Sequence, residues 1–206
     1  MLDEGLNTST VHEKQIRQTI TDAFASRPAY LIVSTVEPRK NHAYLLDAFD
    51  LLWDQGYDIS LIIAGRIGWK VKDLVARIMT HSQYGKRLFL LSDLTDQEVV
   101  YCYRHAKMLV FPSIVEGFGL PIVESLSNRL PVLASDTPVH REVGKNQIGY
   151  FDLSNPRHLS DTIKNIEANG IPAGLQVPDD YKWTSWREST RQLLIKVMDI
   201  GCQQAE

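Results

Sequence analysis

The 206-residue chain has only two cysteines, Cys102 and Cys202, far apart in the sequence. Two cysteines in a chain of this length do not make a disulfide framework, and neither lies in a C-x-x-C pair or at a metal-ligand spacing. This sparse usage is typical of proteins from a reducing compartment. We therefore expect the chain to work in the cytoplasm.

Long apolar runs and an excess of basic residues are also missing. No run approaches the ~20 residues that cross a bilayer, and residues 1–4 (MLDE) do not begin a signal peptide. We expect any membrane association to be peripheral, at the inner face of the cytoplasmic membrane. The formal net charge of -3 argues against nucleic acid as a partner, because proteins that bind it normally carry a basic face.

Several catalytic signatures are absent. The sequence contains no G-x-x-x-x-G-K-[ST], G-x-S-x-G, H-E-x-x-H or G-x-G-x-x-G. It also lacks an Asp-x-Asp pair that could hold a divalent ion on a nucleotide diphosphate, so we expect no metal and no cofactor. The histidines lack the spacing of metal ligands, and we interpret each as a structural or surface residue, although His42 lies close after the basic pair Arg39-Lys40. They are His12, His42, His81, His105, His140 and His158.

The composition is that of an ordinary globular domain, with 44% hydrophobic and 23% charged residues. Short apolar runs alternate with stretches of helical periodicity, a pattern typical of βα units around a parallel sheet. It predicts an α/β fold, a Rossmann-like sheet of about six parallel strands with helices on both faces. Strands are expected over 30–33, 59–64, 87–91, 108–111, 131–134 and 148–151, and helices over 41–53, 71–79, from 95, from 121, and over 138–143, 156–168 and 184–198.

Two helix starts have capping signals. Asn41 is expected to cap the helix that follows the first strand. Thr95, with Glu98 three residues later, predicts a capping box.

The segment from Glu116 to Glu124, EGFGLPIVE, is the most informative in the chain. It follows an apolar run, and its glycines permit a tight turn from strand to helix, while Pro121 suits the first turn of the helix. A helix N-terminus after a strand binds anions, and carboxylates beside it can accept hydrogen bonds from sugar hydroxyls. Because helical side chains lean toward the N-terminus, both carboxylates can border one pocket. The simpler alternative is that one glutamate caps the helix and the other is solvated.

Arg39 and Lys40 lie just after the first predicted strand. In an open parallel sheet, ligands bind outside the carboxyl ends of the strands, so this pair is expected near the Glu116 segment. The two cations could neutralise a diphosphate, with arginine donating two hydrogen bonds and lysine acting as a point charge. A solvated basic turn is the alternative.

The segment 116–124 resembles the Glu-x7-Glu motif of retaining glycosyltransferases of the GT-B fold, family GT4. The block 35–42, TVEPRKNH, is similar to the EPRKN signature of mannosyltransferase-like members that build bacterial surface polysaccharides. The resemblance extends over about residues 30–194. It implies transfer with retention of anomeric configuration, with mannose from GDP-mannose as the donor and a surface glycan as the acceptor.

The resemblance also implies a role for each matching residue. Glu116 would hold the donor sugar, Glu124 would bind the nucleotide ribose, and Arg39 and Lys40 would bind phosphate, so that Glu116, Arg39 and Lys40 form the catalytic group. The remaining expected donor-binding residues are the turn Gly117, Phe118, Gly119 and Leu120 at the diphosphate, Ser92 and Leu94 at the nucleobase, Gly65 and Arg66 at the pocket edge, and Ser34 and Thr35. For Gly65 and Arg66 a purely structural turn is an equal alternative.

The pair Ser34-Thr35 departs from the family, which usually has a glycine here. A side chain at Ser34 restricts the approach of phosphate to the backbone, although its hydroxyl can supply a hydrogen bond instead.

A complete GT-B enzyme has two Rossmann-like domains, and every matched motif belongs to the C-terminal, donor-binding one. We therefore expect residues 29–206 to form a donor-binding domain and residues 1–28 to be an interdomain connection or the edge of an excised piece. The acceptor glycan is expected to be bound by a missing N-terminal domain.

Two other functions remain open. One is a noncatalytic nucleotide-sugar binding or scaffold module that regulates a partner enzyme, and the other is a GT-B epimerase.

Overall fold

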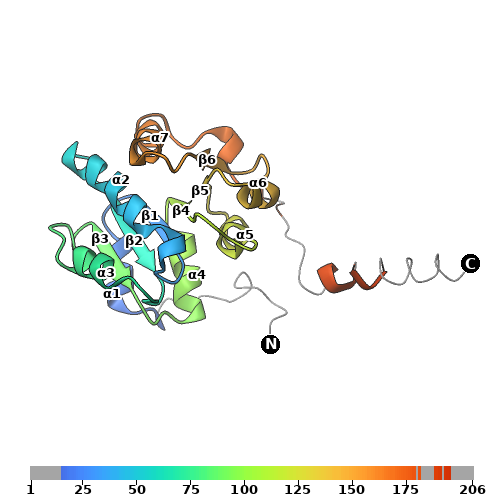
Figure 1. The fold of residues 1–206 in the computed structure, drawn as a ribbon, viewed down its shortest axis with the longest axis horizontal. Helices are drawn as coiled ribbons and strands as arrows, with labels where there is room; N and C mark the ends of the chain where they lie inside the picture. The colour runs from blue at the N-terminus through green and yellow to red at the C-terminus, as the bar shows by residue number, and fades with distance from the viewer. Residues whose placement is uncertain (1–14, 180, 182–187, 192, 196–206) are drawn as a thin grey trace, which may run out of the picture.

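The computed structural model describes residues 15–179, 181, 188–191 and 193–195. They form one α/β unit in which helices cover both faces of a sheet (Figure 1). The elements in chain order are α1 (Gln18–Phe24), β1 (Ala29–Val33), the 3-10 helix η2 (Pro38–Lys40), α2 (His42–Asp54), β2 (Ser60–Ala64), α3 (Lys72–Met79), β3 (Leu88–Leu91), α4 (Asp96–His105), β4 (Met108–Phe111), α5 (Leu120–Ser127), β5 (Val132–Ser135), α6 (Pro138–Gly144), β6 (Gly149–Phe151), α7 (Pro156–Asn169) and the 3-10 helix η3 (Ala173–Leu175).

The sheet has six parallel strands in the order β3-β2-β1-β4-β5-β6. This is the Rossmann order, in which the chain winds outward from β1 in one direction and then, through β4, in the other. The central strand β1 is paired on both sides, so that Tyr30 lies opposite Leu61 of β2 and Met108 of β4. The fold class expected from the sequence is confirmed.

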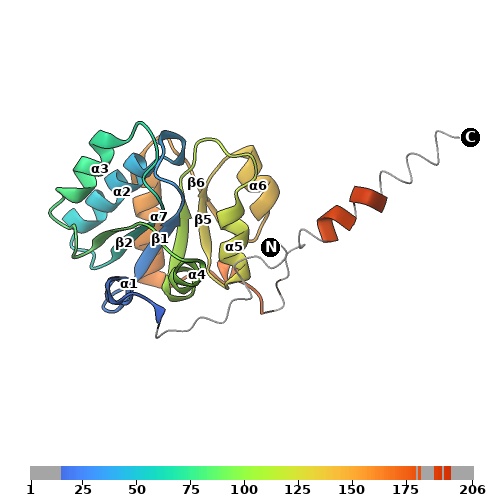
Figure 2. The same ribbon diagram turned by 90° about the horizontal axis from the view of Figure 1, so that it is seen from below.

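Each face of the sheet has its own hydrophobic core. Residues of α2, α3 and α7 pack with Tyr30 and Ile32 on one face, and residues of α1, α4 and α5 pack with Leu31 on the other. The view in Figure 2 shows these two helical layers on opposite sides of the strands. Because parallel strands are buried on both faces, they read in the sequence as continuous apolar runs rather than alternating ones. This is why the strand positions were predictable.

Part of the segment expected as an interdomain connection packs within the domain. In α1, Ile20 is 1% exposed and Ala23 is 3% exposed, and both lie in the core under α4 and β2. Just before α1, Arg17 forms an ion pair with Glu98 of α4 at 2.7 Å. Residues 16–24 therefore contribute to the stability of the domain.

The two capping predictions have different outcomes. At Thr95 the full capping box is present, because its side chain accepts from the Glu98 N–H and the Glu98 carboxylate accepts from the Thr95 N–H. At Asn41 the prediction is wrong. The backbone there is left-handed (φ 58°), its N–H donates to Pro38 in η2, and its side chain makes no capping hydrogen bond.

The other predicted boundaries agree with the structure to within about two residues. The expected helix over 184–198 falls partly outside the described residues. Within it, residues 188–191 and 193–195 are described, and these are helical.

Candidate functional site

The strand order reverses between β1 and β4, and this switch point is where open α/β sheets bind ligands. The segment after β1 and the segment after β4 lie side by side at this point, where the Ile114 N–H donates to the Arg39 carbonyl at 2.8 Å. The turn η2 directs Arg39 and Lys40 toward the segment after β4. Residues far apart in the sequence thus meet at one edge of the sheet.

Glu116 is the centre of an ionic cluster at this edge. Its Oε1 accepts from Lys40 Nζ at 2.5 Å, and its Oε2 accepts from Arg39 Nη1 at 2.8 Å. The side chains of Lys40 and Glu116 are 9% and 8% exposed, whereas that of Arg39 is 46% exposed. The cluster therefore combines an almost buried ion pair with an arginine that reaches into solvent.

The charges in this cluster balance. Arg39 also pairs with Glu37 at 3.1 Å, so that two cations face two carboxylates. Burial is the largest effect on the pKa of Glu116 and raises it, but the interactions with Lys40, Ser113 and Arg39 together outweigh burial, so that the pKa is lowered below its ordinary value. Glu116 is consequently ionised at neutral pH and can accept hydrogen bonds.

The turn between β4 and α5 depends on one of its two glycines. Gly119, the N-cap of α5, is left-handed with φ 98°, a conformation that residues with side chains rarely adopt. Gly117 has no such backbone, and a side chain there would meet nothing within 4 Å. Pro121 lies in the first turn of α5, as expected, and Phe118 and Leu120 are 40% and 45% exposed beside the ionic cluster.

Glu124 has a different environment from Glu116. It is half-buried in α5, and its Oε2 accepts from the hydroxyl of Tyr103 in α4 at 2.8 Å. Burial raises the pKa of Glu124, and the hydrogen bond from Tyr103 only partly opposes this. Glu116 and Glu124 share no hydrogen-bond partner within the described part of the chain.

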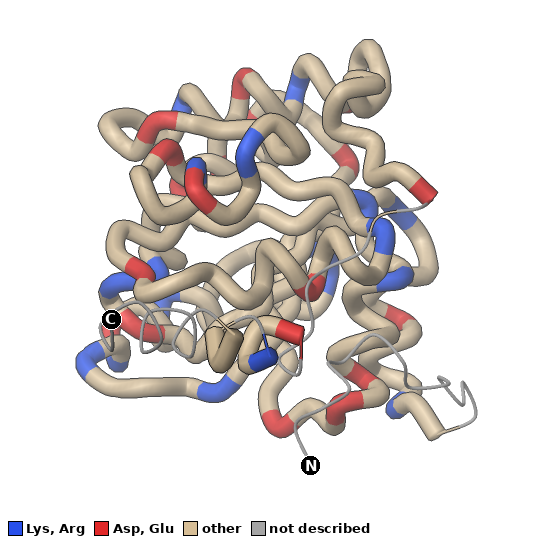
Figure 3. Tube along the Cα trace, turned by 90° about the vertical axis from the view of Figure 1, so that its right-hand side faces the viewer, with Lys and Arg blue, Asp and Glu red and all other residues tan. Residues whose placement is uncertain are grey.

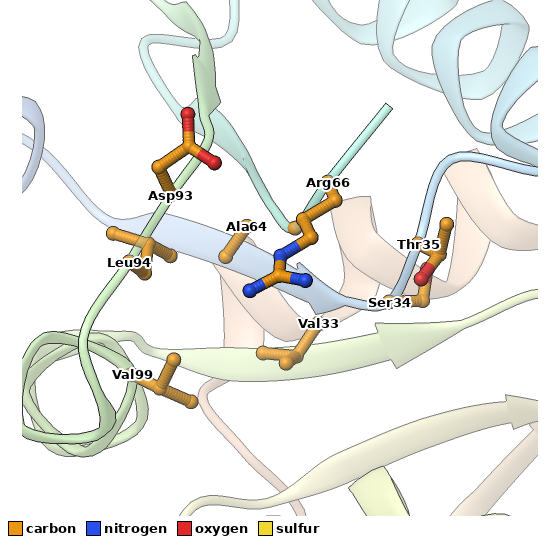
Figure 4. A pocket seen from close by; sticks show the side chains of 9 residues that line it. Val33, Ser34, Thr35, Ala64, Arg66, Asp93, Leu94 and Val99 are labelled. Carbon is orange, nitrogen blue, oxygen red and sulfur yellow. The ribbon is translucent and has the colours of Figure 1, made fainter. Parts of the chain in front are cut away.

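A pocket of about 370 Å³ lies at the carboxyl ends of β1 and β2. Figure 4 shows the guanidinium of Arg66 extended over the strand ends, Ser34 and Thr35 at one side and Asp93 and Leu94 at the opposite side. The complete lining is Val33, Ser34, Thr35, Ala64, Gly65, Arg66, Asp93, Leu94 and Val99. Five residues expected from the sequence to bind the donor are among them: Ser34, Thr35, Gly65, Arg66 and Leu94.

The structure therefore gathers two groups among the expected site residues. Five of them line the pocket at the ends of β1 and β2 and after β3, while Arg39, Lys40 and Glu116 form the ionic cluster. Glu124 and the turn 117–120 belong to neither group. The segment from Ser34 to Lys40 connects the two groups.

Gly65 is required by a close approach of two backbones. A side-chain Cβ at this position would lie 1.9 Å from the Ser34 carbonyl oxygen, and φ is 155°. The Gly65 N–H donates to the Leu91 carbonyl at 2.9 Å, which joins the ends of β2 and β3. Gly65 is therefore needed for the structure of this turn, and the same turn also forms a wall of the pocket.

Arg17 is a residue that the sequence did not indicate. Its Nη2 donates to the carbonyls of Ser92 and Asp93 at 3.3 and 3.1 Å, and its Nε donates to Glu98 at 2.7 Å. These bonds hold the segment after β3, in which Asp93 has a positive φ of 53°. Ser92, expected as a donor-binding residue, is absent from the lining of the pocket. No local pattern could have revealed Arg17, because it acts on residues far along the chain.

Two of the histidines are buried near the site. His42 and His140 are each 1% exposed. His42 Nε2 lies 3.2 Å from Ser34 Oγ, and His140 Nδ1 lies 2.9 Å from the Ser135 carbonyl. Burial, with a smaller effect of Lys40, lowers the pKa of His42 to about 4, so this imidazole is neutral at physiological pH.

The described residues contain no group of three or more His, Cys, Asp or Glu side chains suited to a metal ion. No helix among them is long and apolar enough to span a bilayer. Figure 3 shows Lys and Arg interspersed with Asp and Glu along the chain trace, rather than gathered in one basic face.

A six-stranded sheet of Rossmann order, with an ionic cluster at its switch point, defines the class of the protein. It is a Rossmann-like α/β domain of the kind that forms one half of a GT-B glycosyltransferase. The family model described as glycosyl transferases group 1 matches residues 14–177. The chain belongs to this family.

Relatives and solved structures agree with this assignment. The serotype-specific mannosyltransferase WbdA of Escherichia coli is 34% identical over 181 residues, which cover 86% of this chain and 22% of WbdA. The O-antigen chain mannosyltransferase RfbU of Salmonella typhimurium is 30% identical over 139 residues, 67% of this chain and 38% of RfbU. The crystal structure of Anabaena Alr3699/HepE in complex with UDP superimposes with a TM-score of 0.64 at 17% identity, covering 82% of this chain and 47% of that one. The chain thus spans between about a fifth and a half of the length of these proteins.

Proposed function

We propose that this chain is the donor-binding domain of a retaining glycosyltransferase that transfers mannose from GDP-mannose to a bacterial surface glycan. Membership of the glycosyl transferases group 1 family supports the transferase activity. The names of WbdA and RfbU, both mannosyltransferases, support mannose as the sugar, and that of RfbU supports an O-antigen acceptor. The UDP in the HepE complex supports a nucleotide-sugar donor.

One observation carries the proposal. At the switch point of the sheet, the Glu116 carboxylate is held between Arg39 and Lys40, directly before the N-terminus of α5 and next to the pocket. A diphosphate needs cations and N–H donors, whereas a sugar needs hydrogen-bond acceptors. The cluster offers both within one small region.

The reaction would use these charges in sequence. The donor diphosphate would take hydrogen bonds from Arg39 and Lys40, while Glu116 accepts hydrogen bonds from sugar hydroxyls in exchange. As the bond from the anomeric carbon to the diphosphate oxygen breaks, an acceptor hydroxyl oxygen would become bonded to the same face of that carbon, its proton passing to the leaving diphosphate. The two cations and the α5 N-terminus would stabilise the negative charge on that diphosphate. This scheme requires no metal, and Glu124 would bind the ribose.

The acceptor glycan would be bound by a second domain, with the reaction in the cleft between the two. We place the protein in the cytoplasm, in peripheral contact with the inner face of the membrane, where a surface glycan is extended. A noncatalytic nucleotide-sugar module that regulates a partner enzyme is the competing function.

Calorimetric titration of the 206-residue chain with GDP, GDP-mannose, UDP and UDP-glucose in EDTA tests the donor site. We expect GDP to bind without a divalent ion and GDP-mannose to bind more tightly. Binding that returns only with magnesium or manganese would show that the metal-free scheme is wrong.

Two variants test the separate roles of the glutamates. Glu124→Ala should weaken GDP itself by roughly 10- to 150-fold, the cost of a charge-assisted hydrogen bond. Glu116→Gln should mainly remove the extra affinity of GDP-mannose over GDP. Glu142→Ala, at an exposed position of α6, is the matched control and should change neither affinity. Equal loss of GDP binding in the two site variants would contradict the division of roles.

Incubation with labelled GDP-mannose and a lipid-linked acceptor separates the enzyme from the regulatory module. We expect the chain alone to bind donor without transferring sugar, because the proximity of the two reactants, which can supply ~7 to 11 kcal/mol of barrier lowering, requires the acceptor domain. Addition of that domain should restore transfer. Transfer by the 206-residue chain alone would mean that it is a complete enzyme.

A further inference from the structure

His42 is a buried polar side chain to which the scheme above assigns no role. It is the first residue of α2 and is 1% exposed. Its Nε2 lies 3.2 Å from Ser34 Oγ, and its Nδ1 is buried without a hydrogen-bond partner. Within the described part of the chain, His42 is also the only hydrogen-bond partner of the Ser34 hydroxyl.

The position of the single ring proton follows from these contacts. A neutral imidazole has one N–H, on either Nδ1 or Nε2. A proton on Nδ1 would leave a buried donor unpaired, which is rarer in proteins than an under-used acceptor. A proton on Nε2 instead donates to Ser34 Oγ, and it leaves only an unused acceptor at the buried Nδ1. We therefore assign the proton to Nε2.

This assignment decides what the Ser34 hydroxyl can do. Because its oxygen accepts from His42, its own hydrogen is not used toward His42 and has no acceptor among the described residues. Ser34 lines the 370 Å³ pocket, and the guanidinium of Arg66, which is a donor only, lies between the Ser34 end and the Asp93 end of that pocket (Figure 4). The acceptor-bearing Asp93 lies at the opposite side. The Ser34 end of the pocket thus presents hydrogen-bond donors to an anionic group.

We propose that His42 is a positioning residue that directs the Ser34 hydroxyl hydrogen to a phosphate oxygen of the bound nucleoside diphosphate. The inference rests on the proposed function, since it places the diphosphate at this end of the pocket. It also gives a role to the serine at the position where the resemblance to family GT4 implies a glycine. The hydroxyl supplies the hydrogen bond that close approach of the backbone would otherwise supply.

The test is a double-mutant cycle read by calorimetry with GDP, or with UDP if that is the nucleotide that binds, and with the matching nucleoside. Ser34→Ala removes the hydroxyl, and His42→Phe keeps an aromatic ring, somewhat larger than imidazole, but removes its donor. We expect each variant to lose roughly 10- to 150-fold in nucleoside diphosphate affinity, the range for a hydrogen bond to a charged group. The double variant should lose no more than Ser34→Ala alone, because both changes remove the same hydrogen bond. Nucleoside affinity should stay unchanged in all three.

His42→Gln keeps the inference testable if the phenylalanine variant fails to fold. The glutamine side chain can place an N–H near the position of Nε2, so it should retain most of the diphosphate affinity. Additive losses in the cycle, an equal loss of nucleoside binding, or unchanged affinity in Ser34→Ala would each overturn the inference. A wild-type chain that binds neither GDP nor UDP would overturn the proposed function itself, and that result is distinguishable because it precedes any mutation.

Discussion

Removal of the Glu116 carboxylate should destabilise the fold as well as impair the site. In Glu116→Ala, the Lys40 side chain, which is only 9% exposed, loses the carboxylate partner of its ammonium at 2.5 Å. The exposed Arg39 can be solvated by water, so the cost arises almost entirely from the lysine.

The expected magnitude follows from the burial of this pair. Breaking a buried ion pair by removing one partner costs about 3–5 kcal/mol, since an uncompensated charge is left in the interior. A domain of this kind is stable by about 5–15 kcal/mol, so the variant should be folded but marginal. Glu116→Gln keeps the shape and the hydrogen-bond acceptor, and should cost about 1.5–3 kcal/mol. Glu37→Ala, which removes the other carboxylate of Arg39, is the control and should cost less than about 1 kcal/mol.

Urea denaturation followed by circular dichroism gives these differences directly, and pH provides a second measurement. The pKa of Glu116 in the folded protein lies below its ordinary value of 4.5. Its ionisation therefore stabilises the fold above pH 4.5, and this contribution disappears as the pH falls through the folded pKa. The difference in stability between wild type and Glu116→Gln should shrink over that interval.

A cost below about 1 kcal/mol for Glu116→Ala would refute the reasoning. It would mean that Lys40 reaches water in the variant, and that the pair is not the buried junction between the segments after β1 and β4. An equally large effect of Glu37→Ala would also contradict it, because the exposed pair would then count as much as the buried one.

Two further changes test the scaffold around the pocket. Gly65→Ala should lower the free energy of unfolding, measured with urea, by at least about 2–3 kcal/mol, because its Cβ would lie 1.9 Å from the Ser34 carbonyl oxygen. Gly174→Ala is the control: its Cβ would meet nothing within 4 Å, so its effect should stay within about 0.5 kcal/mol, and equal effects of the two changes would contradict the close approach. A hydrogen bond from Arg17 lowers the pKa of Glu98 to about 2, so the ionised carboxylate stabilises the fold above pH 4.5 and loses this effect between pH 4.5 and 2. In Glu98→Gln the free energy of unfolding should therefore fall less steeply over this acid range than in the wild type. An unchanged slope would show that the pair with Arg17 does not contribute.

Much of the fold could be predicted because its signals are local. The strands β1, β2 and β4 are buried on both faces and therefore form uninterrupted apolar runs. Thr95 and Glu98 lie three residues apart and form their capping box without help from the rest of the chain. Asn41 does not cap α2 with its side chain, because its backbone is set by the preceding 3-10 turn, which the identity of the residue at a helix start does not reveal.

The parallel α/β fold and the turn into α5 can be read from the amino-acid order alone, and so can the residue types needed for a diphosphate and a sugar, since each depends on periodicity or on neighbours within a few positions. Which of these residues meet depends on the folded arrangement of the chain. The pairing of Lys40 with Glu116, the hold of Arg17 on the segment after β3 and the contact of His42 with the end of β1 all depend on strand order and burial. Strand order brings residues far apart in the sequence within hydrogen-bond distance, and burial then decides how strongly they interact and whether the imidazole of His42 carries a charge.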